Sequence, residues 1–539
     1  MLVAVSLVAF LPGFFRIPPV DRDEARFAQA TKQMVESGDY VDIRFQGEVR
    51  YKKPVGIYWL QAAGVEAGRA LGVPNADTAI WLYRLPSLVG AISAVLLTYW
   101  AALAFTGSRA GLVAALMMAT SIELGIEARL AKTDAVLLAC SVAAMGALAR
   151  IYLAQRRAPK AAGWAMPAML WTAIAAGVLV KGPLVPMFVA LTALTLSILD
   201  RSARWLLALR PFSGVVWMLA LVLPWFVAIV ERSGASFFEQ AVGHDMLAKI
   251  ASGQEAHGAP PGYYLLLFWV TFWPGSVLAG LAAPAVWRAR REPATQFLLA
   301  WLVPSWLVFE VVTTKLPHYV LPLYPAIAIL IAGVVEGGQL SSPRWLARGA
   351  VGWFVLPVLI AVAVPIVFIV FGHKLGLVAW PFAAAAAICG LFAWWLYEAD
   401  GAERALLRGM AASVLVAITV YAITFPLLPA LFPSALIAEK VKASGCDKPQ
   451  VATTGYYEEP SLVFLTGTET RFTDGAGAAV FLKGGDCRFA LIDARSELAF
   501  AQRANALDLR YKLSGRVDGY NISIGRPVAL SIFRAAAMP

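Results

Sequence analysis

Charged residues lie close to apolar segments near the start of this chain. Asp23, Glu24 and Arg26 belong to VDRDEARFAQ, residues 20–29, and Lys53 belongs to YKKPVGIYW, residues 51–59. A carboxylate at the mouth of a cavity can accept a proton or stabilise developing positive charge, and Arg26 is spaced to orient Asp23. Lys53 could bind a phosphate. Either carboxylate could instead only cap a helix, and Lys53 could only anchor one at a membrane surface.

Similar residues recur at the ends of later apolar runs. Asp134 opens such a run in RLAKTDAVLL, and Lys181 lies in a tight turn in VKGPL. Lys315, His318 and Tyr319 lie together in TTKLPHYVLPLYP. A carboxylate deep in hydrocarbon costs about 2.5–3.5 kcal/mol or more, so a position at the mouth is favoured for Asp134. Asp134 could also serve only as a cap, and Lys181 only as a boundary anchor.

The segment 231–262 carries His244, Lys249 and His257. Its two histidines have no third ligand at helical spacing, and none of the four cysteines lies in a Cys–Cys or Cys–His spacing typical of metal sites. The sequence therefore predicts no metal and no cofactor. It also contains no P-loop and no sugar-nucleotide fingerprint. It has no basic stretch interleaved with aromatics, and this disfavours a nucleic-acid partner.

The elements that must position these residues are membrane helices. The chain has 539 residues, of which 60% are hydrophobic and 15% charged, whereas soluble domains average about 25% charged residues. A membrane-spanning helix needs about 20 apolar residues. We expect a polytopic α-helical membrane protein with about 13 helices, at roughly 1–15, 81–104, 110–124, 134–153, 164–180, 183–200, 212–230, 263–284, 295–312, 319–336, 349–371, 376–397 and 408–430.

The basic residues predict the orientation of these helices. With the N-terminus in the cytoplasm, every cytoplasmic loop is basic, as the positive-inside rule requires, and this accounts for much of the net charge of +11. The opposite side then receives loops 16–80 and 231–262, the turns at 125–133, Lys181 and 313–318, and everything after about 431. All the candidate residues thus share one face. Its four lysines, Lys53, Lys181, Lys249 and Lys315, suit an anionic head group whose tail remains in lipid.

Loop 16–80 is predicted to contain two amphipathic helices lying on the outer surface. The first, in DEARFAQATKQMVESGD, has acidic residues in its first turn, Gly38 just past its end, and apolar or small residues at 27, 30, 31, 34 and 35. The second begins with Pro54, at a favoured first helical position, and its Tyr58 and Trp59 suit a membrane interface.

Residues 431–539 are predicted to form a small α/β domain. Expected strands are QVATTGYY, SLVFLTG, AAVFLKG, CRFALIDA and PVALSIFR, and SELAFAQRANAL is an expected helix. If this domain faces the periplasm, Cys446 and Cys487 could form a disulfide. The transmembrane domain would then comprise residues 1–430.

The combined motifs resemble membrane glycosyltransferases of the GT-C fold. The matching features are D-E-x-R-[YF] in the first loop, KP before an interfacial helix, K-x-D at a helix mouth, KGP, a His with a basic residue five positions later, and K-L-P-x-Y. The chain is most similar to the aminoarabinose (4-amino-4-deoxy-L-arabinose) lipid A transferases within the protein O-mannosyltransferase superfamily. It departs from them at Phe27, Lys52 and Val55, where those enzymes usually have tyrosine, an acidic residue and proline.

The resemblance implies inverting transfer of a sugar from undecaprenyl phosphate, or another polyprenyl phosphate, to lipid A or another envelope glycolipid. The reaction would occur at the periplasmic face of the bacterial inner membrane. The implied catalytic residues are Asp23, Glu24 and Asp134; the implied donor-phosphate ligands are Arg26, Lys53, Lys249, Lys315 and Tyr319; and the implied cavity residues are Lys181, His244 and His257. A protein O-mannosyltransferase is an alternative within the enzyme class. A flippase of polyprenyl-linked sugar is a further one, but it would need inverted repeats or broken helices, which the sequence does not indicate.

Overall fold

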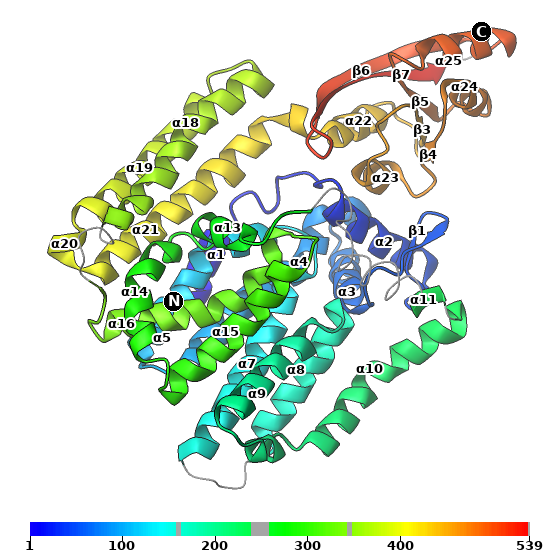
Figure 1. The fold of residues 1–539 in the computed structure, drawn as a ribbon. Coiled ribbons are helices and arrows are strands. Elements are labelled where there is room, and N and C mark those ends of the chain that lie inside the picture. Colours follow the sequence, from blue (N-terminus) through cyan, green and yellow to red (C-terminus); the bar gives the residue numbers. More distant parts are fainter. Residues whose placement is uncertain (158–162, 235, 239–257, 342–347, 537–539) are drawn as a thin grey trace.

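The computed structural model describes residues 1–157, 163–234, 236–238, 258–341 and 348–536 (Figure 1). Within these ranges, eight helices are long and apolar enough to cross a membrane, or nine if a bent pair is one span. The protein is therefore a multi-pass helical membrane protein, as predicted. The eight are Ile80–Ala102 (α4), Asp134–Arg157 (α7), Pro211–Ser233 (α10), Pro293–Val311 (α15), Pro317–Glu336 (η6 and α16), Gly349–Gly372 (chiefly α18), Leu377–Trp395 (η8 and α19) and Ala402–Leu427 (α21 and its continuation).

The remaining predicted spans are also helical but shorter or broken. Three apolar helices have 10–17 residues: α5 (Ser108–Thr120), α8 (Ala165–Lys181) and α9 (Leu184–Leu199). The expected helix at 263–284 is bent by 115° between α13 (Tyr263–Thr271) and the segment Gly275–Arg288, which comprises η5 and α14. Pro274 lies at this break. Proline has no backbone N–H to donate to the helical hydrogen bond, so it favours a break here. α1 covers only Leu2–Phe10, so the total of about 13 spans stays a prediction.

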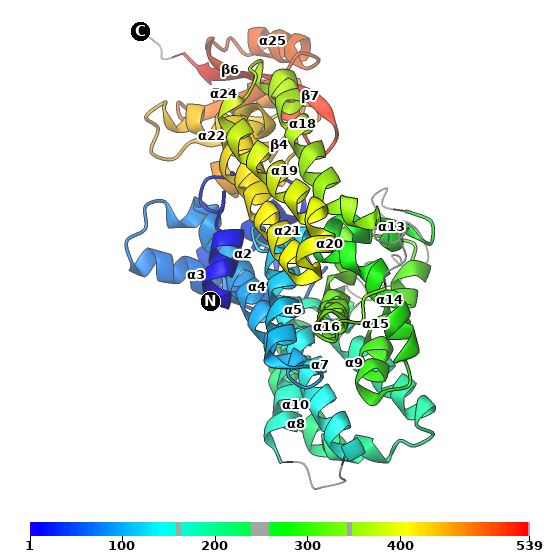
Figure 2. The ribbon, with the colours of Figure 1, turned by 90° about the vertical axis from the view of Figure 1, so that its left-hand side faces the viewer.

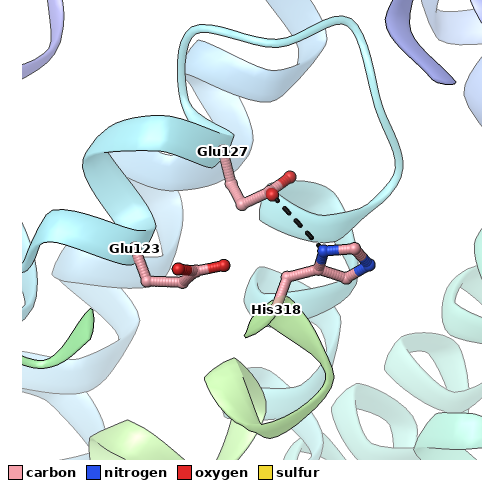
Figure 3. A group of neighbouring side chains, drawn as sticks. All are labelled: Glu123, Glu127 and His318. Atoms are coloured by element: carbon pink, nitrogen blue, oxygen red, sulfur yellow. Dashed lines mark ion pairs between the residues drawn. The ribbon is translucent and has the colours of Figure 1, made fainter. Parts of the chain in front are cut away.

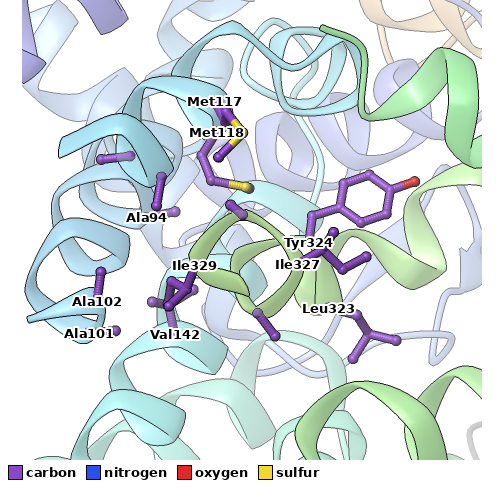
Figure 4. Packing of buried hydrophobic residues seen from close by; sticks show 14 of the residues in the cluster. Ala94, Ala101, Ala102, Met117, Met118, Val142, Leu323, Tyr324, Ile327 and Ile329 are labelled. Carbon is purple, nitrogen blue, oxygen red and sulfur yellow. The ribbon is translucent and has the colours of Figure 1, made fainter. Parts of the chain in front are cut away.

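Small residues let the central helices pack closely. Ala94, Ala101 and Ala102 of α4 and Met117 and Met118 of α5 are buried with residues of α7 and α16 (Tyr324–Glu336) (Figure 4). A Cβ on Gly90 of α4 would lie 2.8 Å from the backbone nitrogen of Val136. Such close backbone approach is typical of membrane helix interfaces. Here it fixes the first turn of α7 against α4.

The first loop forms the two predicted helices, α2 (Asp23–Ser37) and α3 (Gly56–Ala70). Gly38 ends α2 with a φ of 71°, a left-handed conformation that glycine adopts without strain. The predicted apolar face of α2 is buried throughout. A short hairpin, β1 (Arg44–Phe45) with β2 (Glu48–Val49), lies between the helices and was not predicted.

A buried ion pair fixes the start of α2. Arg84 of α4 donates from Nε to Glu24 Oε1 at 2.7 Å and from Nη2 to Glu24 Oε2 at 2.8 Å, and each side chain is 1% exposed. Glu24 also accepts from the backbone nitrogens of Val20 at 2.8 Å and Ala131 at 2.9 Å. Glu24 therefore holds α2 against α4 and against the segment just before α7.

Glu24→Gln should lower the free energy of unfolding by about 3–5 kcal/mol, because it leaves the Arg84 guanidinium buried without its charge partner. Glu66→Gln is the matched control, since its pair with Arg69 is solvent-exposed and worth less than about 1 kcal/mol. Thermal unfolding of the detergent-purified protein measures both. Equal melting temperatures for the two variants would contradict a structural role for Glu24.

The C-terminal region contains a five-stranded mixed sheet of order β4-β3-β5-β7-β6. β3 is parallel to β4 and β5, whereas β7 is antiparallel to β5 and β6. Its elements are α22 (Pro433–Lys442), β3 (Gln450–Thr453), α23 (Pro460–Thr466), β4 (Arg471–Phe472), α24 (Gly475–Lys483), β5 (Arg488–Asp493), α25 (Glu497–Ala506), β6 (Tyr511–Asn521) and β7 (Arg526–Ala535). Figures 1 and 2 place this sheet at one end of the molecule, nearer to α2 than to α8.

Two of the expected C-terminal strands are wrong. SLVFLTG forms α23 and AAVFLKG forms α24. Pro460 opens α23 at a favoured position, and the Asp474 side chain caps α24 by accepting from the Gly477 nitrogen at 2.6 Å. β3, β5, β7 and α25 match the prediction, while β4 and β6 were missed. Cys446 and Cys487 form the predicted disulfide.

The C-terminal region lies on the first loop, so α2 is covered by α23. Lys32 Nζ donates to the Phe464 carbonyl at 3.1 Å, and Gln29 Nε2 donates to Thr468 Oγ1 at 2.9 Å. The Ser461 nitrogen donates to Asp21 Oδ1 at 3.1 Å. Burial, followed by the nearby Glu459 carboxylate, raises the pKa of Asp21 to about 7.

The contact at Asp21 should make stability depend on pH. In the folded protein Asp21 keeps its proton up to a pKa of about 7, whereas the unfolded chain releases it near its ordinary value of 3.8. The folded state thus binds more protons between these values, and stability should fall as pH rises from about 4 to 7, by up to about 1.4 kcal/mol per pH unit. Melting curves of wild type and Asp21→Asn across this range test the effect. An unchanged slope in Asp21→Asn would contradict it.

Candidate active site

Charged side chains from different parts of the chain meet at the N-terminal end of α7. They come from α6 (Ile122–Glu127), the segment 128–133, the last residue of α8, and η6 (Pro317–Leu323). At their centre Asp134, 3% exposed, pairs with Lys181. His318 Nε2 lies 3.6 Å from Asp134 Oδ1, and Lys132 Nζ lies 3.9 Å from Asp134 Oδ2.

Helix geometry explains the pairing of Asp134 with Lys181. Asp134 is the first residue of α7 and Lys181 the last of α8. The N-terminus of a helix stabilises a negative charge and the C-terminus a positive one, by about 0.3–1 kcal/mol each at exposed sites. The two helix ends thus add a favourable electrostatic interaction where Asp134 and Lys181 meet.

Glu127 extends this cluster towards η6. Lys132 Nζ lies 2.9 Å from Glu127 Oε1, and His318 Nδ1 lies 3.6 Å from the same oxygen (Figure 3). Burial raises the pKa of Glu127 to about 7 against the opposing effect of Lys132. Burial alone would lower the pKa of Lys132, but the carboxylates of Glu127 and Asp134 outweigh it and raise that pKa. Lys132 is therefore a permanent cation between two carboxyl groups.

The predicted first-loop residues lie near this cluster. Asp23 is half-buried and close enough to Lys132 to raise its pKa. The Glu24–Ala131 hydrogen bond explains that proximity, because it ties the first turn of α2 to the residue beside Lys132. Lys53 is half-buried, interacts electrostatically with His318, and donates from Nζ to the Lys52 carbonyl at 2.9 Å.

Tyr319 and Lys315 occupy different positions. The Tyr319 ring lies 5.5 Å from Lys181 Nζ, so it borders the cluster. Lys315 Nζ instead donates to the carbonyls of Glu310 at 2.9 Å and Val312 at 2.5 Å. Lysines commonly satisfy the last carbonyls of a helix in this way, and here the side chain closes the end of α15. The geometry therefore favours a structural role for Lys315 over phosphate binding.

The other predicted residues divide into two groups. Arg26 is half-buried on α2. Both oxygens of Glu24 accept hydrogen bonds from Arg84 and from backbone nitrogens. These bonds favour a structural role for Glu24 over a catalytic one. His244, Lys249 and His257 lie outside the described residues.

Sequence reasoning missed Glu123, Glu127 and the part played by Lys132. Residues 110–124 were expected to be one helix, but α5 ends at Thr120 and α6 begins at Ile122. The available signal was the spacing of Glu123 and Glu127, four residues apart and thus on one helical face. A donor atom from each of these glutamates and one from His318 all lie within 4.8 Å of one another, so this trio could hold a metal ion.

Comparison with known proteins relates this chain to lipid-linked sugar transferases. Residues 4–233 match the family described as dolichyl-phosphate-mannose-protein mannosyltransferase. The undecaprenyl phosphate-alpha-4-amino-4-deoxy-L-arabinose arabinosyl transferase of Edwardsiella ictaluri is 27% identical over 351 residues, which are 62% of this chain and 58% of that protein. The enzyme of the same name from Pseudomonas aeruginosa LESB58 is 28% identical over 335 residues, 61% of this chain and 58% of that protein. The chain thus matches less than two thirds of the length of either relative.

The fold is shared over nearly the whole chain. ArnT from Cupriavidus metallidurans in the apo state has a TM-score of 0.76 at 19% identity, covering 98% of this chain and 97% of that one. The same protein bound to undecaprenyl phosphate has a TM-score of 0.75. These comparisons confirm the predicted resemblance to the aminoarabinose transferases and the polytopic architecture.

Proposed function

We propose, from the protein mannosyltransferase family domain that residues 4–233 carry, that this chain is an inverting glycosyltransferase. It would move a sugar from undecaprenyl phosphate, or a related polyprenyl phosphate, to lipid A or another envelope glycolipid. The observation that carries the proposal is the meeting of Asp23, Lys53 and the Asp134–Lys181 pair at one end of the helices. Such a site can hold an anionic head group while its prenyl tail stays in the bilayer.

The proposed reaction is a single displacement at the anomeric carbon of the sugar. The bond from that carbon to the carrier phosphate oxygen breaks as a bond to the acceptor oxygen forms on the opposite face. The carrier leaves as a polyprenyl phosphate. Lys53, Lys249 and Tyr319 would stabilise its developing charge through preorganised electrostatics.

Asp23 would orient the acceptor and, where the acceptor is a hydroxyl, take its proton as general base. Lys132 lies within electrostatic range of Asp23 and would partly offset its negative charge. Asp134 would act as a positioning residue, because its pairing with Lys181 sets that ammonium beside Tyr319. Arg26 would help to orient the first turn of α2.

We assign the site to the periplasmic face of the bacterial inner membrane. The basic loops expected on the opposite side support this orientation. The Cys446–Cys487 disulfide supports it independently, because disulfides persist in oxidising compartments such as the periplasm. In this arrangement residues 1–430, with about 13 spans, form the catalytic unit. Residues 431–539 form a periplasmic domain that covers α2.

Transfer of labelled sugar from purified undecaprenyl-phosphate donor to lipid A, by the full chain in detergent, tests this function. We expect product that depends on both substrates. Movement of the donor across a vesicle membrane without any product would instead support a flippase. Labelling of a periplasmic protein in place of lipid A would support the protein O-mannosyltransferase alternative. Mass spectrometry of envelope glycans with and without the gene would identify the sugar and the acceptor.

A further inference from the structure

Two glutamates and one histidine form a compact donor set beside the candidate active site. Glu123 and Glu127 lie one turn apart on α6, and both carboxyl groups face His318 of η6 (Figure 3). One donor atom from each side chain lies within 4.8 Å of the other two. The elements that carry them come from distant parts of the chain, so folding alone brings the set together.

Part of this donor set has no partner among the described residues. Glu123 is 3% exposed, and its side chain has no hydrogen bond or ion pair within the described part of the chain. Glu127 Oε2 is buried and also without a hydrogen-bond partner there, because Lys132 and His318 both lie against Oε1. Burying an uncompensated carboxylate is costly. A proton or a cation must balance these oxygens.

The charges of the cluster point to a cation. It contains the three carboxyl groups of Glu123, Glu127 and Asp134, and the two ammonium groups of Lys132 and Lys181. Within these five groups one negative charge remains when every carboxyl group is ionised. Among the described residues, Glu127 and Asp134 have ion pairs and Glu123 has none.

We propose that Glu123, Glu127 and His318 bind one divalent transition-metal ion of the Zn²⁺ class. Carboxylate and imidazole are ligands that such an ion accepts, at about 2.0–2.2 Å from each donor atom. Donors that lie within 4.8 Å of one another need only side-chain adjustment to reach that geometry. Mg²⁺ fits less well, because it favours oxygen ligands alone.

The ion would join α6 to η6 and fix the imidazole of His318 between Glu127 and Asp134. It would thereby hold Tyr319, the next residue, beside Lys181. This role is structural and adjacent to the sugar-transfer site. The proposal depends on the donor set alone and does not require the proposed function to be right.

Metal binding to the stripped full-chain protein in detergent tests the site. Equilibrium dialysis against Zn²⁺ should give one ion per chain. Glu123→Gln should weaken binding by more than about 100-fold, because even the loss of an outer-shell partner commonly costs about 10–100-fold. Glu439→Gln, an exposed glutamate on α22, is the matched control and should bind as wild type does. Should Glu123→Gln fail to fold, His318→Gln provides the same readout.

Two of the other three histidines, His244 and His257, serve to separate this site from others. His244→Asn/His257→Asn should retain the ion, and X-ray absorption of the Zn²⁺-loaded protein should show nitrogen and oxygen neighbours without sulfur. The proposal is overturned if wild type binds no stoichiometric ion. It is equally overturned if Glu123→Gln retains the ion while His244→Asn/His257→Asn loses it. Because the readout is binding, a failed transfer assay would leave this result unaffected.

Discussion

Asp23→Asn should lower the transfer rate by about 10²–10⁴-fold, the usual contribution of a general base. Asparagine keeps the size and position of the side chain but cannot take the acceptor proton. Binding of undecaprenyl phosphate should stay unchanged, because the proposed phosphate ligands are Lys53, Lys249 and Tyr319. Single-turnover transfer and donor binding, measured on the same preparation, check both expectations.

Glu48→Gln is the matched control for this variant. Glu48 lies in the same loop but is exposed on the short hairpin, so its neutralisation should change neither quantity. Full turnover by Asp23→Asn with a hydroxyl acceptor would remove Asp23 from its catalytic role. If the acceptor is a phosphate that is already ionised, no base is needed, and the loss should be smaller.

Lys53→Gln should weaken donor binding by about 10–100-fold, because a charge-assisted bond to the phosphate contributes about 1.5–3 kcal/mol. The neighbouring lysine offers an unusually close control. Lys52 is exposed where Lys53 is half-buried, and the Lys53 ammonium donates to the backbone carbonyl of Lys52, which Lys52→Gln retains. Equal losses in both variants would indicate a general effect of surface charge and would contradict a specific phosphate site at Lys53.

The membrane helices were largely predictable because each depends on a property that sequence shows directly. Twenty apolar residues between charged loops have few alternatives to a transmembrane helix. The helix α2 was equally clear, since its apolar spacing and Gly38 are local signals. Helix boundaries near proline were harder to predict. The apolar pattern predicted one span at 263–284, and the break at Pro274 divides it.

The C-terminal errors have a different origin. SLVFLTG and AAVFLKG are short apolar runs, and such runs fit a buried strand or a buried helix equally well. α23 packs between α2 and α22, and α24 packs on β5, so tertiary packing decided the outcome. The helix-start signals at Pro460 and Asp474 were present but outweighed in the prediction by β-branched and aromatic residues.

The residues of the candidate site were easier to predict than the contacts between them. Asp134 and Lys181 were singled out separately, but only the antiparallel placement of α7 and α8 makes them a pair. The role of Glu24 depends on Arg84, sixty residues away and inside an apolar helix. Contacts of that kind carry no local signal in a single sequence.

The central claim is that the first loop and the mouths of α7 and α8 surround one carrier head group. A cryo-electron microscopy map of the full chain in lipid nanodiscs with undecaprenyl phosphate tests it most directly. We predict phosphate density in hydrogen-bond contact with Lys53, on the side of the membrane to which Asp23 opens. A head group bound elsewhere, or Asp23 and Lys53 opening to opposite compartments, would contradict the account.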